Sequence, residues 1–217
     1  MRQALINKTV IHLKKQYSGE TSGHDWWHLY RVWQVAKYIA SKEKNINQEI
    51  VELAALLHDV GDYKFHGGSK EKGAKAVYKL MQDLGYPKSI IDQVLPIVTN
   101  ISYLGAKIAD NQPTQEGKIV QDADRLDATG AIGIARCFAW GGQEHTAIHD
   151  PSLKPVLHQD EGAYMAARGS SINHFYEKLL FLKDRMHTKI GKKLAIKRHK
   201  YMQDFLKKFY AEWDGKE

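Results

Sequence analysis

The stretch LAALLHDVGDYKF, residues 53–65, decides how the rest of the chain is interpreted. Its first five residues are apolar and belong in a core. His58 and Asp59 follow directly, and a glycine and a second carboxylate, Asp62, come soon after. Burying polar groups without partners costs several kcal/mol, so these side chains need compensation. The carboxylates and histidines elsewhere in the sequence indicate that a divalent metal ion provides it.

Composition sets the broad class of protein. The 217 residues suffice for one large domain or two small ones, with 43% hydrophobic and 26% charged residues. No apolar run approaches the roughly 18 residues that span a membrane, and the charged N-terminal stretch is unlike a secretory signal. A single cysteine, Cys137, excludes an internal disulfide. We therefore expect a cytoplasmic protein without a membrane partner.

The formal net charge of +7 permits two interpretations, an anionic partner or a solvated basic face. Much of the excess lies in KIGKKLAIKRHK, residues 189–200. This segment also carries Leu194, Ala195 and Ile196, so it is typical of one side of a helix.

Apolar periodicity is helical almost everywhere and predicts an all-α fold. Asp25 is expected to cap a helix that begins at Trp26, and Asn47 or Gln48 to open the helix with the His-Asp pair. Ser69 is expected near the cap of the next helix, which stops near residues 85–87.

Three later segments complete the expected organisation. Residues 116–140 are predicted to form one long, mostly apolar and buried helix, and two more helices are expected over residues 172–186 and 194–209. The span between residues 141 and 171 is irregular. Irregular connections of this length are uncommon and often functional, so a lid, a substrate wall and a plain surface excursion all stay open.

The candidate metal ligands come from separate predicted helices. His58 and Asp59 point about 100° apart on a helix, but both can reach one ion if it lies at the helix end. His28 lies at the edge of a buried stripe. The segment VQDADRLDA places Asp122, Asp124 and Asp127 on a mostly apolar helix, where a cation would compensate their charge.

This constellation resembles the HD superfamily of metal-dependent phosphohydrolases, whose signature is a histidine, an adjacent His-Asp pair and a distant aspartate. The resemblance covers residues 24–136 and implies His28, His58, Asp59 and Asp124 as metal ligands. Asp124 is preferred to Asp122 because DADRLD matches the family's "aspartate–basic–Leu" form at Asp124. The segments HDWW, NISY and DADRLDATGAIGIAR are similar to segments of small bacterial HD hydrolases that act on nucleotides.

The resemblance implies a single compact HD-domain helical bundle over residues 1–217, with a C-terminal helical extension over residues 160–217. Two imidazoles and two carboxylates suit Mn²⁺, Fe²⁺, Co²⁺, Ni²⁺ or Zn²⁺ better than Ca²⁺. We expect Mn²⁺. His66 is the only histidine between Asp59 and Asp124, which favours a mononuclear site.

The resemblance also implies roles around the metal. Asp62, one helical turn beyond His58, matches a catalytic acidic residue, and Arg125 matches a basic residue that contacts phosphate. Lys64 and Arg31 are further candidates for binding substrate phosphate. His66 is expected either to act on the substrate or to be a surface turn residue, and His24 and Asp25 to line the pocket mouth.

The leading functional prediction is hydrolysis of nucleotides, favouring (d)NTPs, with release of pyrophosphate or phosphate. A nucleoside monophosphatase and a cyclic-nucleotide phosphodiesterase are enzymatic alternatives. The non-enzymatic alternative is a helical nucleic-acid-binding module that uses the basic C-terminal helix. Nucleic acid is not the expected partner, and the sequence leaves the oligomeric state open.

Overall fold

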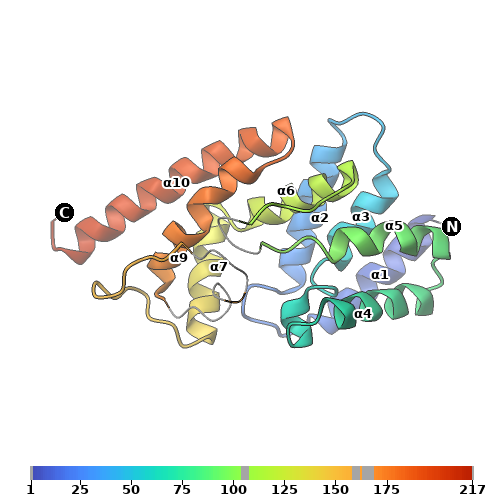
Figure 1. Cartoon of the computed structure of the whole chain (residues 1–217), viewed down its shortest axis with the longest axis horizontal. Helices are drawn as coiled ribbons and strands as arrows, with labels where there is room; N and C mark the ends of the chain where they lie inside the picture. The colour runs from blue at the N-terminus through green and yellow to red at the C-terminus, as the bar shows by residue number, and fades with distance from the viewer. Residues whose placement is uncertain (1, 104–107, 158–161, 163–168, 217) are drawn as a thin grey trace. The chain divides into compact units, whose positions relative to one another are not determined.

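The computed structural model describes residues 2–103, 108–157, 162 and 169–216 (Figure 1). Within these residues the regular structure is entirely helical, which confirms the all-α prediction. The α-helices are α1 (Arg2–Gln16), α2 (Trp26–Ala40), α3 (Gln48–Leu57), α4 (Lys70–Asp83), α5 (Lys88–Val98), α6 (Gln115–Asp127), α7 (Gly130–Gln143), α9 (Ser171–Glu177) and α10 (Lys189–Trp213). Two 3₁₀ helices, η1 (Tyr63–His66) and η2 (Leu179–Arg185), complete the set.

Helix starts follow the capping chemistry predicted from the sequence. The Asp25 carboxylate accepts the backbone N–H of His28 at the start of α2, and the Asn47 side chain accepts the N–H groups of the first turn of α3. The Ser69 hydroxyl caps α4 in the same way. Such caps satisfy amides that have no partner within the helix, typically worth about 1 kcal/mol each.

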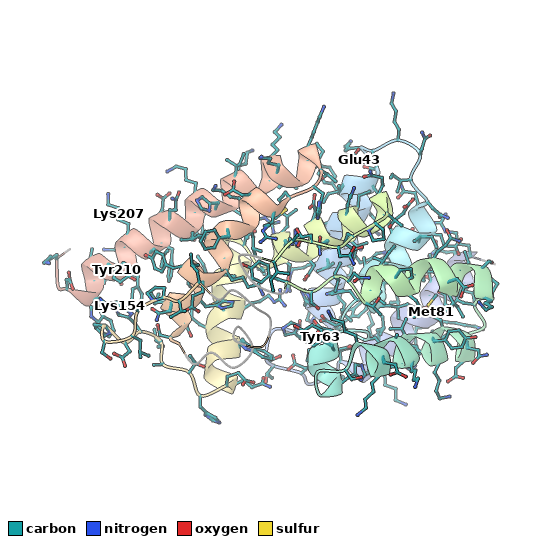
Figure 2. All side chains as sticks on the ribbon, in the orientation of Figure 1. Glu43, Tyr63, Met81, Lys154, Lys207 and Tyr210 are labelled. Carbon is teal, nitrogen blue, oxygen red and sulfur yellow. The ribbon has the colours of Figure 1, made fainter. Side chains whose placement is uncertain are left out.

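Contacts divide the chain into two compact units. The first contains residues 1–103 and 109–124 and is organised around α3. Helices α1, α2 and α5 pack against α3, and α4 packs against α5 and η1. Helix α3 has almost no solvent-facing side, because Ile50, Val51 and residues 53–57 are all buried. Met81 of α4 and Tyr63 of η1, labelled in Figure 2, are buried in the same unit.

The second unit contains residues 104–108 and 125–217. Helix α10 packs against α7 and η2, and α9 packs against η2 and α7. Its core includes Phe175, whose ring stacks on Phe205 with centroids 5.8 Å apart. Lys207 lies on the exposed side of α10 (Figure 2). The one-domain organisation expected from the sequence stays a prediction.

The predicted long helix over residues 116–140 is wrong. The chain forms two helices, α6 and α7, because Thr129 is extended and Gly130 has a φ of +71°, a conformation that interrupts an α-helix. Helix α7 is also less buried than expected, since Ile132 and Trp140 are 42% and 36% exposed.

Two other boundaries differ from the sequence prediction. The helix expected over residues 172–186 is divided into α9 and η2 at Lys178, whose φ and ψ of −140° and −60° are not helical. The irregular span begins only after α7 ends at Gln143. Residues 144–157 contain no regular helix, whereas residues 158–161 and 163–168 lie outside the described part of the chain.

Across the described ranges, no helix has both the length and the apolar character needed to cross a bilayer. The cytoplasmic location stays a prediction.

Candidate metal centre

The turn after α3 presents the His-Asp pair at the end of a buried helix. His58 continues the helical conformation with φ −61° and ψ −41°, and the backbone N–H of Gly61 still donates to the Leu57 carbonyl. His58 and Asp59 are 1% and 3% exposed. His58 and Asp59 therefore lie buried where helix α3 ends, the position from which both could reach one ion.

His58 is oriented by its own helix. Its Nδ1 lies 2.8 Å from the Ala55 carbonyl oxygen, which can only accept, so Nδ1 carries the proton. When the ring is neutral, the lone pair is on Nε2, which faces His28 Nε2 at 3.0 Å and Asp59 Oδ1 at 3.2 Å. A backbone carbonyl bonded to the second ring nitrogen is the usual support of a metal-binding histidine.

His28 approaches from α2. Asp25 caps this helix through the His28 N–H at 2.8 Å, which places His28 in the first helical turn. The His28 side chain is fully buried, and its Nε2 lies 3.5 Å from Asp59 Oδ2. An amphipathic helix thus turns its one buried histidine toward the His-Asp pair.

Helix α6 contributes Asp124. Its Oδ1 lies 3.6 Å from His28 Nε2 and 3.7 Å from His58 Nε2. The side chain is 28% exposed, so this donor borders the solvent, whereas Asp122 is fully buried. Among the described residues, the groups of His, Cys, Asp and Glu that could hold a metal include Asp124 and not Asp122. The choice of Asp124 over Asp122 as a ligand stays a prediction.

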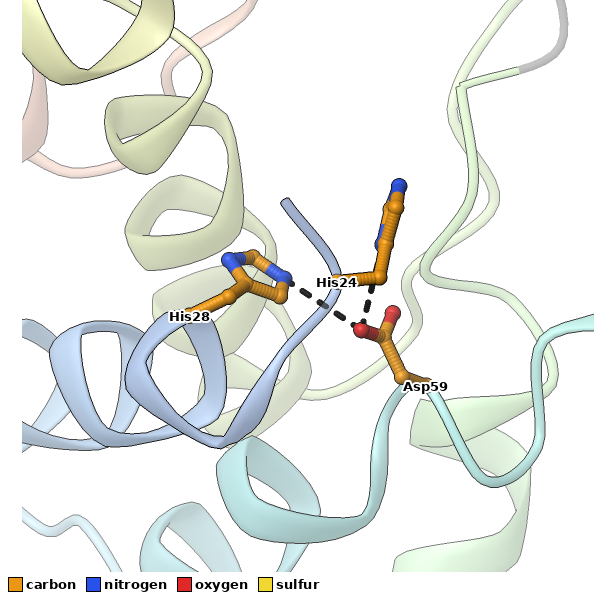
Figure 3. A group of neighbouring side chains, drawn as sticks. All are labelled: His24, His28 and Asp59. Carbon is orange, nitrogen blue, oxygen red and sulfur yellow. Dashed lines mark hydrogen bonds and ion pairs between the residues drawn. The ribbon is translucent and has the colours of Figure 1, made fainter. Parts of the chain in front are cut away.

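His24 joins the cluster, although the sequence analysis placed it only at a pocket mouth. Figure 3 shows His24 and His28 directed at the same Asp59 oxygen, Oδ2, and His24 Nδ1 lies 3.2 Å from it. The sequence signal was its position immediately before the N-cap Asp25, one turn before His28. Spacing alone does not show that the ring turns inward.

Charges inside the cluster reinforce one another. Burial opposes ionisation of Asp59, but His58, His24 and His28 outweigh burial and hold the pKa of Asp59 well below its usual range. Burial likewise favours neutral His58, but Asp59 and Asp124 outweigh it and raise the pKa of His58. Burial raises the pKa of Tyr17, and Asp59 and Asp62 raise it further, so this phenol lies within electrostatic reach of both carboxylates.

The donor set fits a divalent metal ion. Two donors that are each about 2.1 Å from one ion, at right angles to each other, lie about 3.0 Å apart. The His28 and His58 Nε2 atoms are 3.0 Å apart, and their distances to the carboxylate oxygens of Asp59 and Asp124 are 3.2–3.7 Å. All four residues lie within the first unit.

The predicted catalytic and substrate-binding residues have different surroundings. Asp62 is 5% exposed, and the Ser102 hydroxyl donates to its Oδ2 at 3.1 Å. Arg31 is half-buried on α2. Lys64 lies in η1, and its side chain is outside the description.

His66 is held on the turn by donating from Nε2 to the Val60 carbonyl at 2.8 Å. Arg125 follows Asp124 along α6, is 3% exposed, and donates from Nη1 to the Arg185 carbonyl. Asp127 pairs with Arg136 at 3.1 Å. The charge of Asp127 is thus compensated by an arginine, as is usual for a buried carboxylate in a structural role.

The three-helix arrangement of histidines and aspartates identifies a class of protein. The HD domain family matches residues 26–129, a range that includes all four predicted metal ligands. The chain belongs to the HD superfamily. The family resemblance and the enzyme class predicted from it, an HD-superfamily phosphohydrolase, are confirmed.

Individual relatives agree over nearly the whole chain. The Bacillus subtilis protein YpgQ is 38% identical over 197 residues, which cover 90% of this chain and 87% of YpgQ. A Bacillus thuringiensis structure described as an HD-superfamily hydrolase is 41% identical, with a TM-score of 0.73 and 99% of both chains covered. The crystal structure of YpgQ in complex with ADP has a TM-score of 0.73 at 32% identity, covering 98% of this chain and all of YpgQ.

Proposed function

We propose that this protein is a metal-dependent hydrolase of nucleotides, with (d)NTPs as substrates and pyrophosphate or phosphate as a product. The observation that carries the proposal is the convergence of His28, His58, Asp59 and Asp124, from three parts of the fold, on one small region. The structure of the relative YpgQ with ADP supports a nucleotide as the ligand.

These four side chains would hold one divalent ion, for which Mn²⁺ is our first choice. The mixed nitrogen and oxygen donors support a transition metal rather than Ca²⁺. When bound, such an ion neutralises charge on a phosphoryl oxygen and lowers the pKa of coordinated water. The buried environment strengthens these electrostatic effects, because charges interact more strongly where water is excluded.

Asp62 is proposed as the catalytic carboxylate. It is buried four residues beyond His58, and its Oδ2 accepts a hydrogen bond from Ser102. This bond fixes the carboxylate while leaving it able to accept a proton from the water that attacks phosphorus. Ser102 belongs to the segment after α5, so the proposal gives this segment a supporting role.

Binding of the substrate phosphates is assigned to Arg125, Lys64 and Arg31. A nucleoside triphosphate carries several negative charges, and cations that stabilise them are the recurring requirement of phosphoryl-transfer sites. Arg125 is the first candidate because it directly follows the proposed ligand Asp124.

A substrate panel tests the proposal. Protein stripped of metal is supplied with Mn²⁺, Co²⁺, Ni²⁺, Zn²⁺ or Mg²⁺ and with nucleoside triphosphates, monophosphates or cyclic nucleotides. We expect metal-dependent hydrolysis of triphosphates, and product analysis separates pyrophosphate from orthophosphate. Exclusive hydrolysis of monophosphates or of cyclic nucleotides would replace the proposed substrate with one of these two classes.

Matched variants test the centre itself. His58→Ala removes a buried donor, whereas Asp124→Asn changes a partly exposed one. Asp124→Asn therefore tests the centre even if His58→Ala fails to fold. Both are expected to lose metal binding and activity, whereas His12→Ala, on the exposed side of α1, is expected to retain them. Full activity in folded His58→Ala and Asp124→Asn proteins would overturn the proposed centre.

A further inference from the structure

His24 is fixed in place by the loop that precedes α2. The two oxygens of Glu20 accept the backbone N–H groups of Ser22, at 2.8 Å, and of His24, at 3.1 Å. Gly23 between them has a φ of +91°, which glycine adopts at little cost. The following residue, Asp25, is the N-cap of α2. Two carboxylates therefore hold the backbone on both sides of His24.

The ring of His24 also contacts neighbouring side chains. It makes edge-to-face contacts with His28 and Phe65, each with ring centroids 5.5 Å apart. The His24 side chain is 23% exposed. Its Nδ1 faces Asp59 Oδ2 at 3.2 Å (Figure 3). The ring therefore connects the loop before α2 to the turn after α3.

Asp59 uses its two oxygens differently. Oδ1 lies 3.2 Å from His58 Nε2, whereas Oδ2 lies 3.2 Å from His24 Nδ1 and 3.5 Å from His28 Nε2. A carboxylate that is only 3% exposed has little contact with bulk solvent, so hydrogen-bond donors from the protein stabilise its charge. Hydrogen bonds to a ligating carboxylate fix its orientation and tune its affinity for metal.

We infer that His24 is a positioning residue that donates from Nδ1 to Asp59 Oδ2 and thereby presents this carboxylate to the metal. The inference rests on the proposed function, because it assumes that Asp59 binds an ion. It differs from direct ligation by His24. The atoms of His24, His28 and Asp59 also lie close enough together to hold an ion, so the two roles must be separated by experiment.

Substitution of His24 separates these roles. Loss of a residue that supports a ligand typically lowers metal affinity about 10–100-fold. We expect this loss in His24→Ala, measured by competition with a chromogenic chelator. His24→Asn should recover most of the affinity, because an asparagine amide places an N–H close to the position of Nδ1. At saturating metal, His24→Ala should lower kcat more than it changes KM.

The visible spectrum of the Co²⁺-loaded protein reports directly on the ligands. If His24 positions Asp59, the spectrum of His24→Ala at saturating Co²⁺ should match that of the unchanged protein, because the ligands are the same. A spectrum that shows loss of a nitrogen ligand would overturn the inference in favour of direct ligation. Wild-type metal affinity in His24→Ala, or no recovery in His24→Asn, would also overturn it.

Failure of this inference is distinguishable from failure of the proposed function. If His58→Ala and Asp124→Asn abolish Co²⁺ binding while His24→Ala has no effect, only the role of His24 is wrong. If His58→Ala and Asp124→Asn retain wild-type Co²⁺ binding, the metal centre itself is wrong. His12→Ala, an exposed histidine on α1, controls for unspecific effects of histidine removal.

Discussion

Helices α3 and α10 show two different uses of a helix in one chain. In α3, seven of ten residues are buried, and the chain leaves the helix through the buried pair His58 and Asp59. In α10, a 25-residue helix, the buried residues are Gly191, Ala195, Met202 and Leu206, and lysines line much of the remaining surface. The difference shows that burial, rather than helix length, determines where charged side chains interact strongly with one another. Charges interact most strongly where water is excluded.

Core truncation should produce the largest difference between the two helices. Leu56 of α3 is fully buried, and Leu56→Ala is expected to lower the free energy of unfolding by about 2–5 kcal/mol. Ile196 of α10 is 53% exposed, and Ile196→Ala should change it by no more than about 0.5 kcal/mol. Urea titration measures both. Equal losses would contradict the comparison.

Metal should stabilise the protein through the end of α3. Mn²⁺ at about 100 times its dissociation constant is expected to add about 2.7 kcal/mol to the free energy of unfolding. A chelator should reverse the effect. Thermal unfolding with and without Mn²⁺ measures it, and Asp124→Asn is the control. The same stabilisation in this variant would place the ion elsewhere.

A close backbone approach beneath the His-Asp turn gives a smaller effect. A Cβ atom on Gly73 of α4 would lie less than 3.0 Å from the Gly61 carbonyl oxygen, and backbone cannot yield as a flexible side chain does. Gly73→Ala is expected to cost about 1–3 kcal/mol and to weaken metal binding, because the turn must shift.

Gly142 of α7 provides the matched control for Gly73, since a Cβ atom there meets no atom within 4 Å. Gly142→Ala should be neutral, or stabilise α7 by about 0.5–1 kcal/mol, because alanine favours the helix. Urea titration and metal titration measure both variants. A harmless Gly73→Ala would show that the turn is less tightly packed than its contacts indicate.

The smallest expected effect concerns pH and Glu20. Burial opposes ionisation of Glu20, but hydrogen bonds from Ser22 and His24 outweigh it and lower the pKa of Glu20 below 4.5. The ionised carboxylate therefore stabilises the folded protein above this pH, and the contribution is lost as the pH falls through the folded-state pKa.

Substitution of Glu20 tests this pH dependence. Thermal unfolding measured between about pH 6 and pH 3 should show a shallower loss of stability in Glu20→Gln than in the unchanged protein. Identical pH profiles would show that these hydrogen bonds do not favour the ionised form.

The sequence predicted much of the fold because its signals are local. Caps at Asp25, Asn47 and Ser69 follow from the hydrogen bonds that free helix-terminal amides require. The break at Thr129 and Gly130 was missed, because apolar residues continue across it and a glycine is compatible with either a helix or a turn. Apolar content also overstated the burial of α7.

The order of motif residues along the chain was sufficient to predict which residues form the core of the candidate site. His28, His58, Asp59 and Asp124 lie together, as the resemblance implied, but their role as ligands stays a prediction. The contact between His24 and Asp59 depends on the loop held by Glu20 and on a ring orientation that tertiary packing determines. The surroundings of Arg125 likewise depend on Arg185, a residue distant in sequence.

The spread of the proposed ligands from residue 28 to residue 124 has a consequence for synthesis and damage. A nascent chain that ends before α6 lacks Asp124, and a protein clipped between α5 and α6 holds its donors only while the pieces stay associated. Metal uptake by the intact centre would therefore report that the first unit has folded completely. Binding of a spectroscopically visible ion such as Co²⁺ could then be used to assess preparations of this protein.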